Sequence, residues 1–109
     1  FDEEKLIELK IENLINKGYS TKKIKLFLKK NFFDERLIIE KIKNLELESD
    51  LEEKLIDKYL SKSGLSKKIK INMDKSDIEK ILKKLLLQGF NYNQIVKYLK
   101  EKHNLYDYS

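Results

Sequence analysis

The residues best suited to chemistry in this sequence are lysines that stand in a run without a neighbouring acid. From residue 17 to residue 30 the chain carries six ammonium groups and no carboxylate. They belong to Lys17, Lys22, Lys23, Lys25, Lys29 and Lys30. Cations at this density attract phosphate groups or an acidic protein surface. A lysine cannot form the planar, bidentate hydrogen bonds that an arginine forms. We therefore expect these side chains to bind a phosphate backbone without recognising base sequence.

A second basic set follows in the C-terminal half, where we expect Lys80, Lys83, Lys84 and Lys97 to bind the same partner and Tyr92 to stack on a base. The alternative is a solvated face, because the chain is rich in lysine throughout, with 24 Lys+Arg against 19 Asp+Glu and a net charge of +5. Between the two sets, residues 34–58 hold nine acids and five bases. These acids fit either an acidic contact surface or ordinary helix starts with (i, i+4) ion pairs.

Several functions are excluded by what the sequence lacks. It has no cysteine, which excludes disulfides, iron–sulfur clusters and thiol catalysis. It has no phosphate-binding loop, no zinc-protease motif and no nucleophile paired with a base. His103 is the one histidine, and Glu4, Glu8 and Glu12 share a predicted helix face that lysines flank. We therefore expect no enzyme, no metal and no cofactor.

The apolar runs are too short for a membrane-spanning helix. The first residues are acidic, without a signal peptide or an initiator Met, so we expect a fragment of a cytoplasmic protein.

Helices must position these side chains, because proline is absent and apolar residues recur at a spacing near 3.6. Such stripes and their caps predict six helices, at about 2–16, 20–30, 34–45, 49–60, 77–88 and from 91 onward. Ser20 is expected to cap the second helix, and S-x-x-E boxes at Ser49 and Ser76 to start the fourth and fifth. Asn91 is expected to cap the last. Residues 63–72 are predicted to form a loop, with a short strand at 69–71 as an option.

One helix–elbow–helix pattern occurs twice, 71 residues apart. Lys17-Gly18-Tyr19-Ser20 recurs as Gln88-Gly89-Phe90-Asn91, and Lys30-Asn31-Phe32-Phe33 is a weaker copy 13 residues after the first. In each we expect Gly or Asn in the left-handed conformation, an aromatic ring (Tyr19, Phe32 or Phe90) on the core, and a polar cap. The predicted fold class is all-α, with two tandem three-helix modules, 1–47 and 48–109, joined by short elbows in an elongated arrangement.

These elbows and their flanking helices resemble the RecX family. Leu14-Ile15-Asn16-Lys17-Gly18-Tyr19-Ser20-Thr21-Lys22-Lys23-Ile24, continuing through Phe27-Leu28 to Phe33-Asp34-Glu35, is similar to its middle module. Ile81-Leu82-Lys83-Lys84-Leu85-Leu86-Leu87-Gln88-Gly89-Phe90-Asn91-Tyr92-Asn93-Gln94-Ile95 is similar to its last module, where the elbow reads R-G-F. The resemblance covers about residues 6–102. The first of the family's three modules has no counterpart here, and Gln88 stands in place of the arginine.

The resemblance implies a regulator of the RecA recombinase, acting in homologous recombination, DNA repair and the SOS response. Members of this family bind the RecA–single-stranded-DNA filament, limit its growth and lower its ATPase and strand-exchange activities. For this chain we therefore expect a non-enzymatic, monomeric inhibitor that binds the RecA filament, binds single-stranded DNA weakly on its own and does not bind membranes. Two alternatives stay open: a non-specific DNA-binding domain of helix-turn-helix type, and a helical module that binds only protein.

Overall fold

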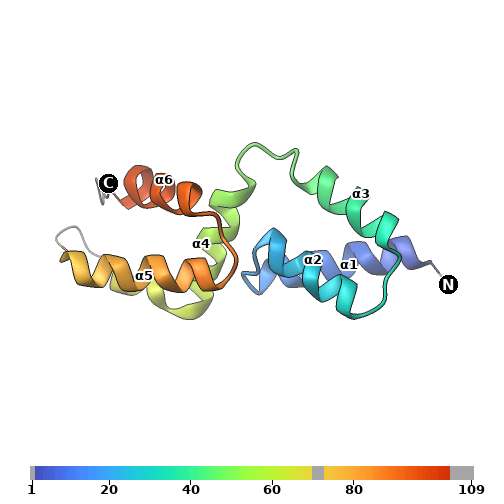
Figure 1. The fold of residues 1–109 in the computed structure, drawn as a ribbon, viewed down its shortest axis with the longest axis horizontal. Helices are drawn as coiled ribbons and strands as arrows, with labels where there is room; N and C mark the ends of the chain where they lie inside the picture. The colour runs from blue at the N-terminus through green and yellow to red at the C-terminus, as the bar shows by residue number, and fades with distance from the viewer. Residues whose placement is uncertain (1, 70–72, 104–109) are drawn as a thin grey trace.

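The computed structural model describes residues 2–69 and 73–103, and every regular element in those ranges is helical. The elements are α1 (Glu3–Asn16), α2 (Thr21–Lys30), α3 (Glu35–Leu45), α4 (Leu51–Ser63), the 3₁₀ turn η1 (Leu65–Lys68), α5 (Lys75–Leu87) and α6 (Tyr92–His103). Figure 1 shows α1–α3 at one end of the molecule and α4–α6 at the other. The all-α fold class is confirmed.

In the N-terminal half, α1, α2 and α3 pack around aliphatic side chains that recur every three or four residues along each helix. The buried ones are Ile7, Ile11, Leu14, Ile24, Leu28, Ile38 and Ile42. Each helix starts at a side-chain cap: Asp2, Ser20 and Asp34 accept hydrogen bonds from backbone amides of the first turn. The predicted cap at Ser20 is confirmed.

In the C-terminal half, α4, α5 and α6 enclose a second core. Its buried residues are Leu51, Leu55, Ile56, Leu60, Leu65, Ile78, Ile81, Leu85, Phe90, Ile95, Tyr98 and Leu99. The predicted caps of α4 and α5 are wrong. Asp74, two residues before Ser76, caps α5 because its carboxylate accepts from the Asp77 amide at 2.9 Å. Asp50 precedes α4 without a side-chain cap bond, so the predicted Ser49–Glu52 box does not form.

The predicted loop after α4 is partly helical. Gly64 ends α4 in the left-handed conformation, with φ of 78°, and η1 follows directly. Leu65 of η1 is buried in the second core, which fixes this segment against α4. Most of the optional strand at 69–71 lies outside the described residues.

Three elbows share one hydrogen-bond pattern, that of a helix ending on a left-handed residue. An aromatic residue donates its amide to the carbonyl five positions earlier: Tyr19 to Leu14, Phe33 to Leu28 and Phe90 to Leu85. The residue before each aromatic has a positive φ: 84° at Gly18, 62° at Phe32 and 95° at Gly89. The predicted left-handed glycines are confirmed.

The elbow between α2 and α3 differs from its prediction by one residue. Asn31 has a φ of −96°, and Phe32 takes the left-handed position instead. The ring of Phe32 is 94% exposed, so its predicted place on the core is wrong, and Phe33 supplies the packed ring. The cap sets this register, because Asp34 follows Phe33 as Ser20 follows Tyr19.

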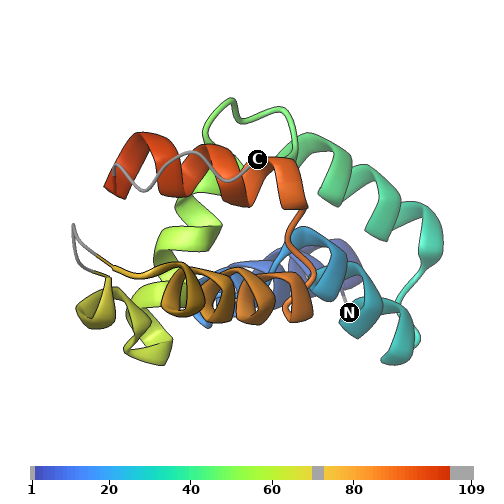
Figure 2. The same cartoon turned by 60° about the vertical axis from the view of Figure 1, so that its left-hand side comes forward.

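The molecule is elongated, with principal extents of 52 × 23 × 17 Å. Ile15 and Leu45 pack against both cores and join the two halves. Figure 2 shows the two groups of helices from a second direction. The chain leaves the first core after Ile42 and enters the second at Leu51, an interval that contains the predicted boundary at residue 47. The repeated elbow joins α1 to α2 in one half and α5 to α6 in the other, so the halves are not copies in the same helix register.

Candidate functional site

The lysines of α2 are largely exposed, but two of them already face carboxylates. Lys17, Lys22 and Lys30 are exposed and form no ion pair within the described ranges. Lys25 Nζ lies 3.4 Å from Glu46 Oε1, and Lys29 Nζ lies 3.7 Å from Glu35 Oε1. Glu35 is the first residue of α3 and Glu46 directly follows its last residue, so both acids lie outside the acid-free run of residues 17–30. Exposed pairs of this kind each stabilise a protein by less than about 1 kcal/mol, so a phosphate can displace the carboxylates at small cost.

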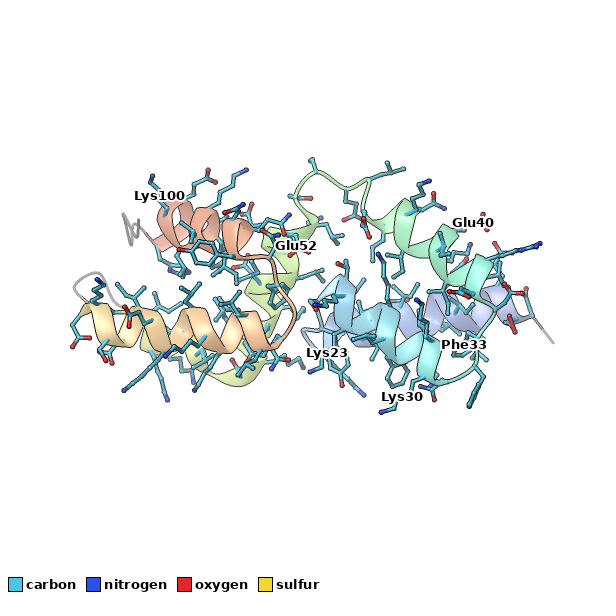
Figure 3. The ribbon with its side chains drawn as sticks, in the orientation of Figure 1. Lys23, Lys30, Phe33, Glu40, Glu52 and Lys100 are labelled. Carbon is cyan, nitrogen blue, oxygen red and sulfur yellow. The ribbon has the colours of Figure 1, made fainter. Side chains whose placement is uncertain are left out.

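Lys23 has a different environment from the other lysines of α2. Its Nζ donates to Gln88 Oε1 at 2.7 Å and lies 4.5 Å from the centre of the Tyr19 ring. Figure 3 shows Lys23 where the start of α2 meets the end of α5. The ammonium group is therefore engaged within the molecule, at the junction between its halves.

The two glycine elbows meet at this junction. Ser20 Oγ caps α2 and also donates to the Gln88 carbonyl oxygen at 2.6 Å. A Cβ added to Gly89 would lie 2.7 Å from Ser20 Oγ, and one added to Gly18 would lie 2.6 Å from the Cα of Tyr59. The junction thus requires a residue without a Cβ at both elbows, besides the positive φ.

Lysines of α5 form the least neutralised basic surface. Lys80, Lys83 and Lys84 are exposed and have no ion pair among the described residues. Lys80 and Lys84, together with Lys68 of η1, line an open groove of about 470 Å³. Leu65, Met73 and Ile81 line the same groove, as do Asp74 and Asp77 at the start of α5. The groove therefore combines three ammonium groups with apolar side chains and two carboxylates.

The helices that carry the two basic sets meet at the junction. Figure 1 shows α5 and α2 nearly end to end along the long axis, and the Lys22 side chain reaches Gly89, where α5 ends. We call the following lysines the basic edge: Lys17, Lys22 and Lys30 of the N-terminal half and Lys80, Lys83 and Lys84 of α5. Lys25 and Lys29 are not part of it, because they pair with Glu46 and Glu35. The acidic turn between α3 and α4 lies on the opposite side (Figure 1). The separation of charge is partial, because Lys25 of α2 pairs with Glu46 of this turn.

Two predicted site residues lie on α6, apart from this edge. Lys97 is exposed and lines a small pocket with Glu52, Glu53 and Glu101, so its surroundings are acidic. Tyr92, at the start of α6, is 46% exposed. The structure brings neither of them to the groove of Lys80 and Lys84.

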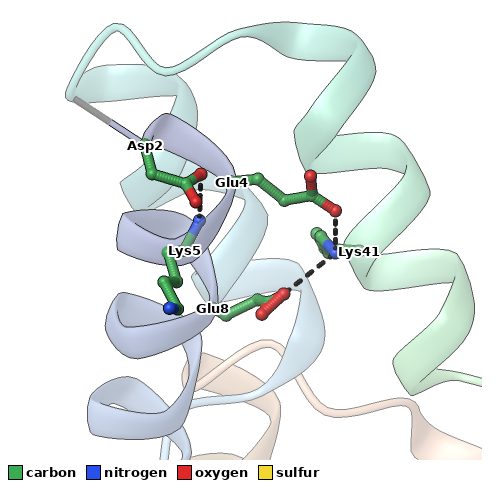
Figure 4. A network of polar contacts seen from close by, with 5 residues as sticks. All are labelled: Asp2, Glu4, Lys5, Glu8 and Lys41. Carbon is green, nitrogen blue, oxygen red and sulfur yellow. Dashed lines mark hydrogen bonds and ion pairs between the residues drawn. The ribbon is translucent and has the colours of Figure 1, made fainter.

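The aligned carboxylates of α1 bind a lysine of the same chain. Lys41 Nζ of α3 lies 2.6 Å from Glu4 Oε1 and 3.0 Å from Glu8 Oε2 (Figure 4). Hydrogen bonds to Glu4 and then Glu8 raise the pKa of Lys41 above its usual value. These contacts tie α1 to α3, which gives the carboxylates a structural role.

Burial shifts the pKa values of further groups, among them Glu52 and His103. Burial first, and the charge of Glu46 second, raise the pKa of Glu52, whose Oε2 is buried without a hydrogen-bond partner in the described part of the chain. Burial lowers the pKa of His103, which lies 3.3 Å from the Tyr98 hydroxyl. Tyr98 in turn donates to Asp57. Across residues 2–69 and 73–103, no group of three or more His, Cys, Asp or Glu side chains is arranged to hold a metal ion.

Comparison with known proteins yields no relative: no family model, no curated protein and no solved structure matches this chain. Among the described helices, none has both the length and the apolar character needed to cross a membrane.

Proposed function

We propose that this chain is a non-enzymatic regulator that binds the RecA–single-stranded-DNA filament through its basic edge and limits filament growth, ATPase and strand exchange. The observation that carries the proposal is the end-to-end placement of α5 and α2, which brings the helices that hold the two lysine sets together. The RecX-like elbows support it, because they are the elements that create this placement.

The mechanism is a difference in affinity. A polymer of phosphates and repeated protein subunits offers a long surface, and the molecule is 52 Å in its longest dimension. Lys80, Lys83 and Lys84, which have no ion pair in the described ranges, bind first, and Lys25 and Lys29 then exchange their carboxylates for phosphates. Tighter binding to the filament than to free subunits shifts the assembly equilibrium.

DNA-dependent ATP hydrolysis by RecA, titrated with this chain, tests the proposal. Inhibition at less than one chain per RecA subunit is expected. Replacing Lys80 and Lys84 with Gln should weaken inhibition severalfold. Replacing Lys5 and Lys10 of α1 with Gln changes the net charge equally and should leave inhibition intact. Equal effects of the two double variants would contradict the assignment of the basic edge.

The alternative is non-specific binding to naked DNA, and the unpaired lysines beside the groove favour it as the second candidate. In that case, naked DNA should bind as tightly as the filament. Affinity should then fall roughly tenfold per doubling of salt if about four phosphates are neutralised.

A further inference from the structure

The side chain of Phe32 is the most unusual feature of the described surface. It is the one described residue other than glycine with a positive φ, at 62°, and its ring is 94% exposed. A bulky residue in the left-handed conformation costs about 1–2 kcal/mol. The equivalent positions of the other elbows hold Gly18 and Gly89, which avoid that cost.

The fold does not need the ring of Phe32. Phe33 packs against the N-terminal core, and Asp34 caps α3. Backbone strain of this kind persists at functional sites, so an exposed aromatic residue that holds it without a packing role points to a binding position.

Charges beside the ring indicate which partner it contacts. Lys30 is exposed and precedes the elbow, and the Phe32 amide donates to the carbonyl oxygen of Lys29 at 3.2 Å. Asn31 turns its side-chain amide back to the Phe27 carbonyl oxygen, 2.8 Å away. Lys29 pairs with Glu35 at 3.7 Å, whereas Lys30 has no ion pair in the described ranges. An exposed ring two residues from such a lysine matches a single-stranded nucleotide, since the base stacks on the ring while its phosphate meets the lysine.

We propose that Phe32 is a stacking platform for one base of a single-stranded nucleic acid, with Lys30 on the adjoining phosphate. This inference rests on the single-stranded-DNA part of the proposed function and not on RecA. It adds a base contact at the α2–α3 elbow, at the far end of α2 from the junction (Figure 1).

The experiment measures binding of a labelled oligothymidylate and of an abasic oligonucleotide of equal length, by fluorescence anisotropy without RecA. The wild-type chain should prefer the oligonucleotide with bases by roughly 5- to 150-fold, the range of one stacked base. The F32Y variant should keep this preference, and F32G should lose it while binding the abasic strand unchanged. Because glycine relieves the left-handed strain, F32G should melt at the same or a higher temperature.

Leu87→Ala is the matched control, since Leu87 is 82% exposed and belongs to α5 with its lysines. It should leave the preference for bases unchanged. Equal binding of both oligonucleotides by the wild-type chain would overturn the proposal and leave a protein partner for the ring. A lower melting temperature of F32G would also overturn it, because it would give Phe32 a structural role. Inhibition of RecA by the F32G variant is a separate readout, which tests the proposed function and not the stacking. If the wild-type chain neither prefers the oligonucleotide with bases nor inhibits RecA, both the stacking proposal and the proposed function are overturned.

Discussion

Replacing Gly18 with Ala should destabilise the molecule through two separable effects. Gly18 has a φ of 84°, and a Cβ there would lie 2.6 Å from the Tyr59 Cα and 2.9 Å from its backbone nitrogen. The left-handed conformation costs a non-glycine residue about 1–2 kcal/mol. Overpacking against a backbone that cannot rotate away costs about 1–3 kcal/mol more. The free energy of unfolding should therefore fall by about 2–5 kcal/mol, out of about 5–15 kcal/mol for a typical domain.

Gly64→Ala separates the two effects. Gly64 has a similar φ of 78°, but nothing lies within 4 Å of its added Cβ. It should lose only the conformational part, about 1–2 kcal/mol. Thermal melts followed by far-ultraviolet circular dichroism should show this as a smaller shift, at about 4 °C per kcal/mol. If Gly18→Ala melts at the same temperature as Gly64→Ala, the close contact between the elbow and α4 does not exist in solution.

Three other perturbations test the junction and the acidic turn. In urea denaturation, Ser20→Ala should lower the free energy of unfolding by about 2–3 kcal/mol, because it removes both the cap of α2 and the hydrogen bond to Gln88. The control Asp34→Ala removes only an exposed cap and should lower it by about 1 kcal/mol. Equal losses would argue against the hydrogen bond between the halves. Gln88→Arg should lower the free energy of unfolding by about 1–2 kcal/mol, because it removes the acceptor of Lys23 and adds a second cation, and Gln88→Met should lose less; the opposite order would refute this account. Glu52→Gln should stabilise the chain at neutral pH, because burial raises the pKa of Glu52 in the folded state and Gln resembles the protonated side chain. The protonated carboxyl contributes its full stability to the native chain below pH 4.5, and this contribution is lost as the pH rises through the folded-state pKa. The stabilities of the two chains should therefore converge near pH 4, and a difference that stays constant across pH would refute the burial of this carboxylate.

Helices and their buried faces were predictable because they follow from local spacing. Ile78, Ile81 and Leu85 are buried as their stripe requires. Helix starts were less predictable where two capping residues stood close together. Asp74 and Ser76 are both good capping residues, and the structure uses Asp74. The choice depends on how α5 packs against its neighbours, and the local sequence does not specify that packing.

The elbow around Phe32 was misassigned because two aromatic residues stand side by side and only one can pack. The signal that identifies the packed ring is the cap that follows it, since Asp34 comes directly after Phe33. The contact between Ser20 and Gln88 joins residues 68 positions apart and depends on the angle between the halves. The pairs of Lys25 and Lys29 depend likewise on the return of α3 along α2, so the sequence overestimates the free charge of α2.

The double role of the Ser20 hydroxyl has a mechanical consequence. One oxygen atom accepts from the start of α2 and donates to the end of α5, so the halves cannot bend about this point without breaking the hydrogen bond between Ser20 and Gln88. The α3–α4 connection crosses on the opposite side, which leaves the molecule attached along both edges (Figure 1). It should therefore behave as a stiff spacer, in which a load applied at the α2–α3 elbow is transmitted to the far end of α5 as rigid-body rotation.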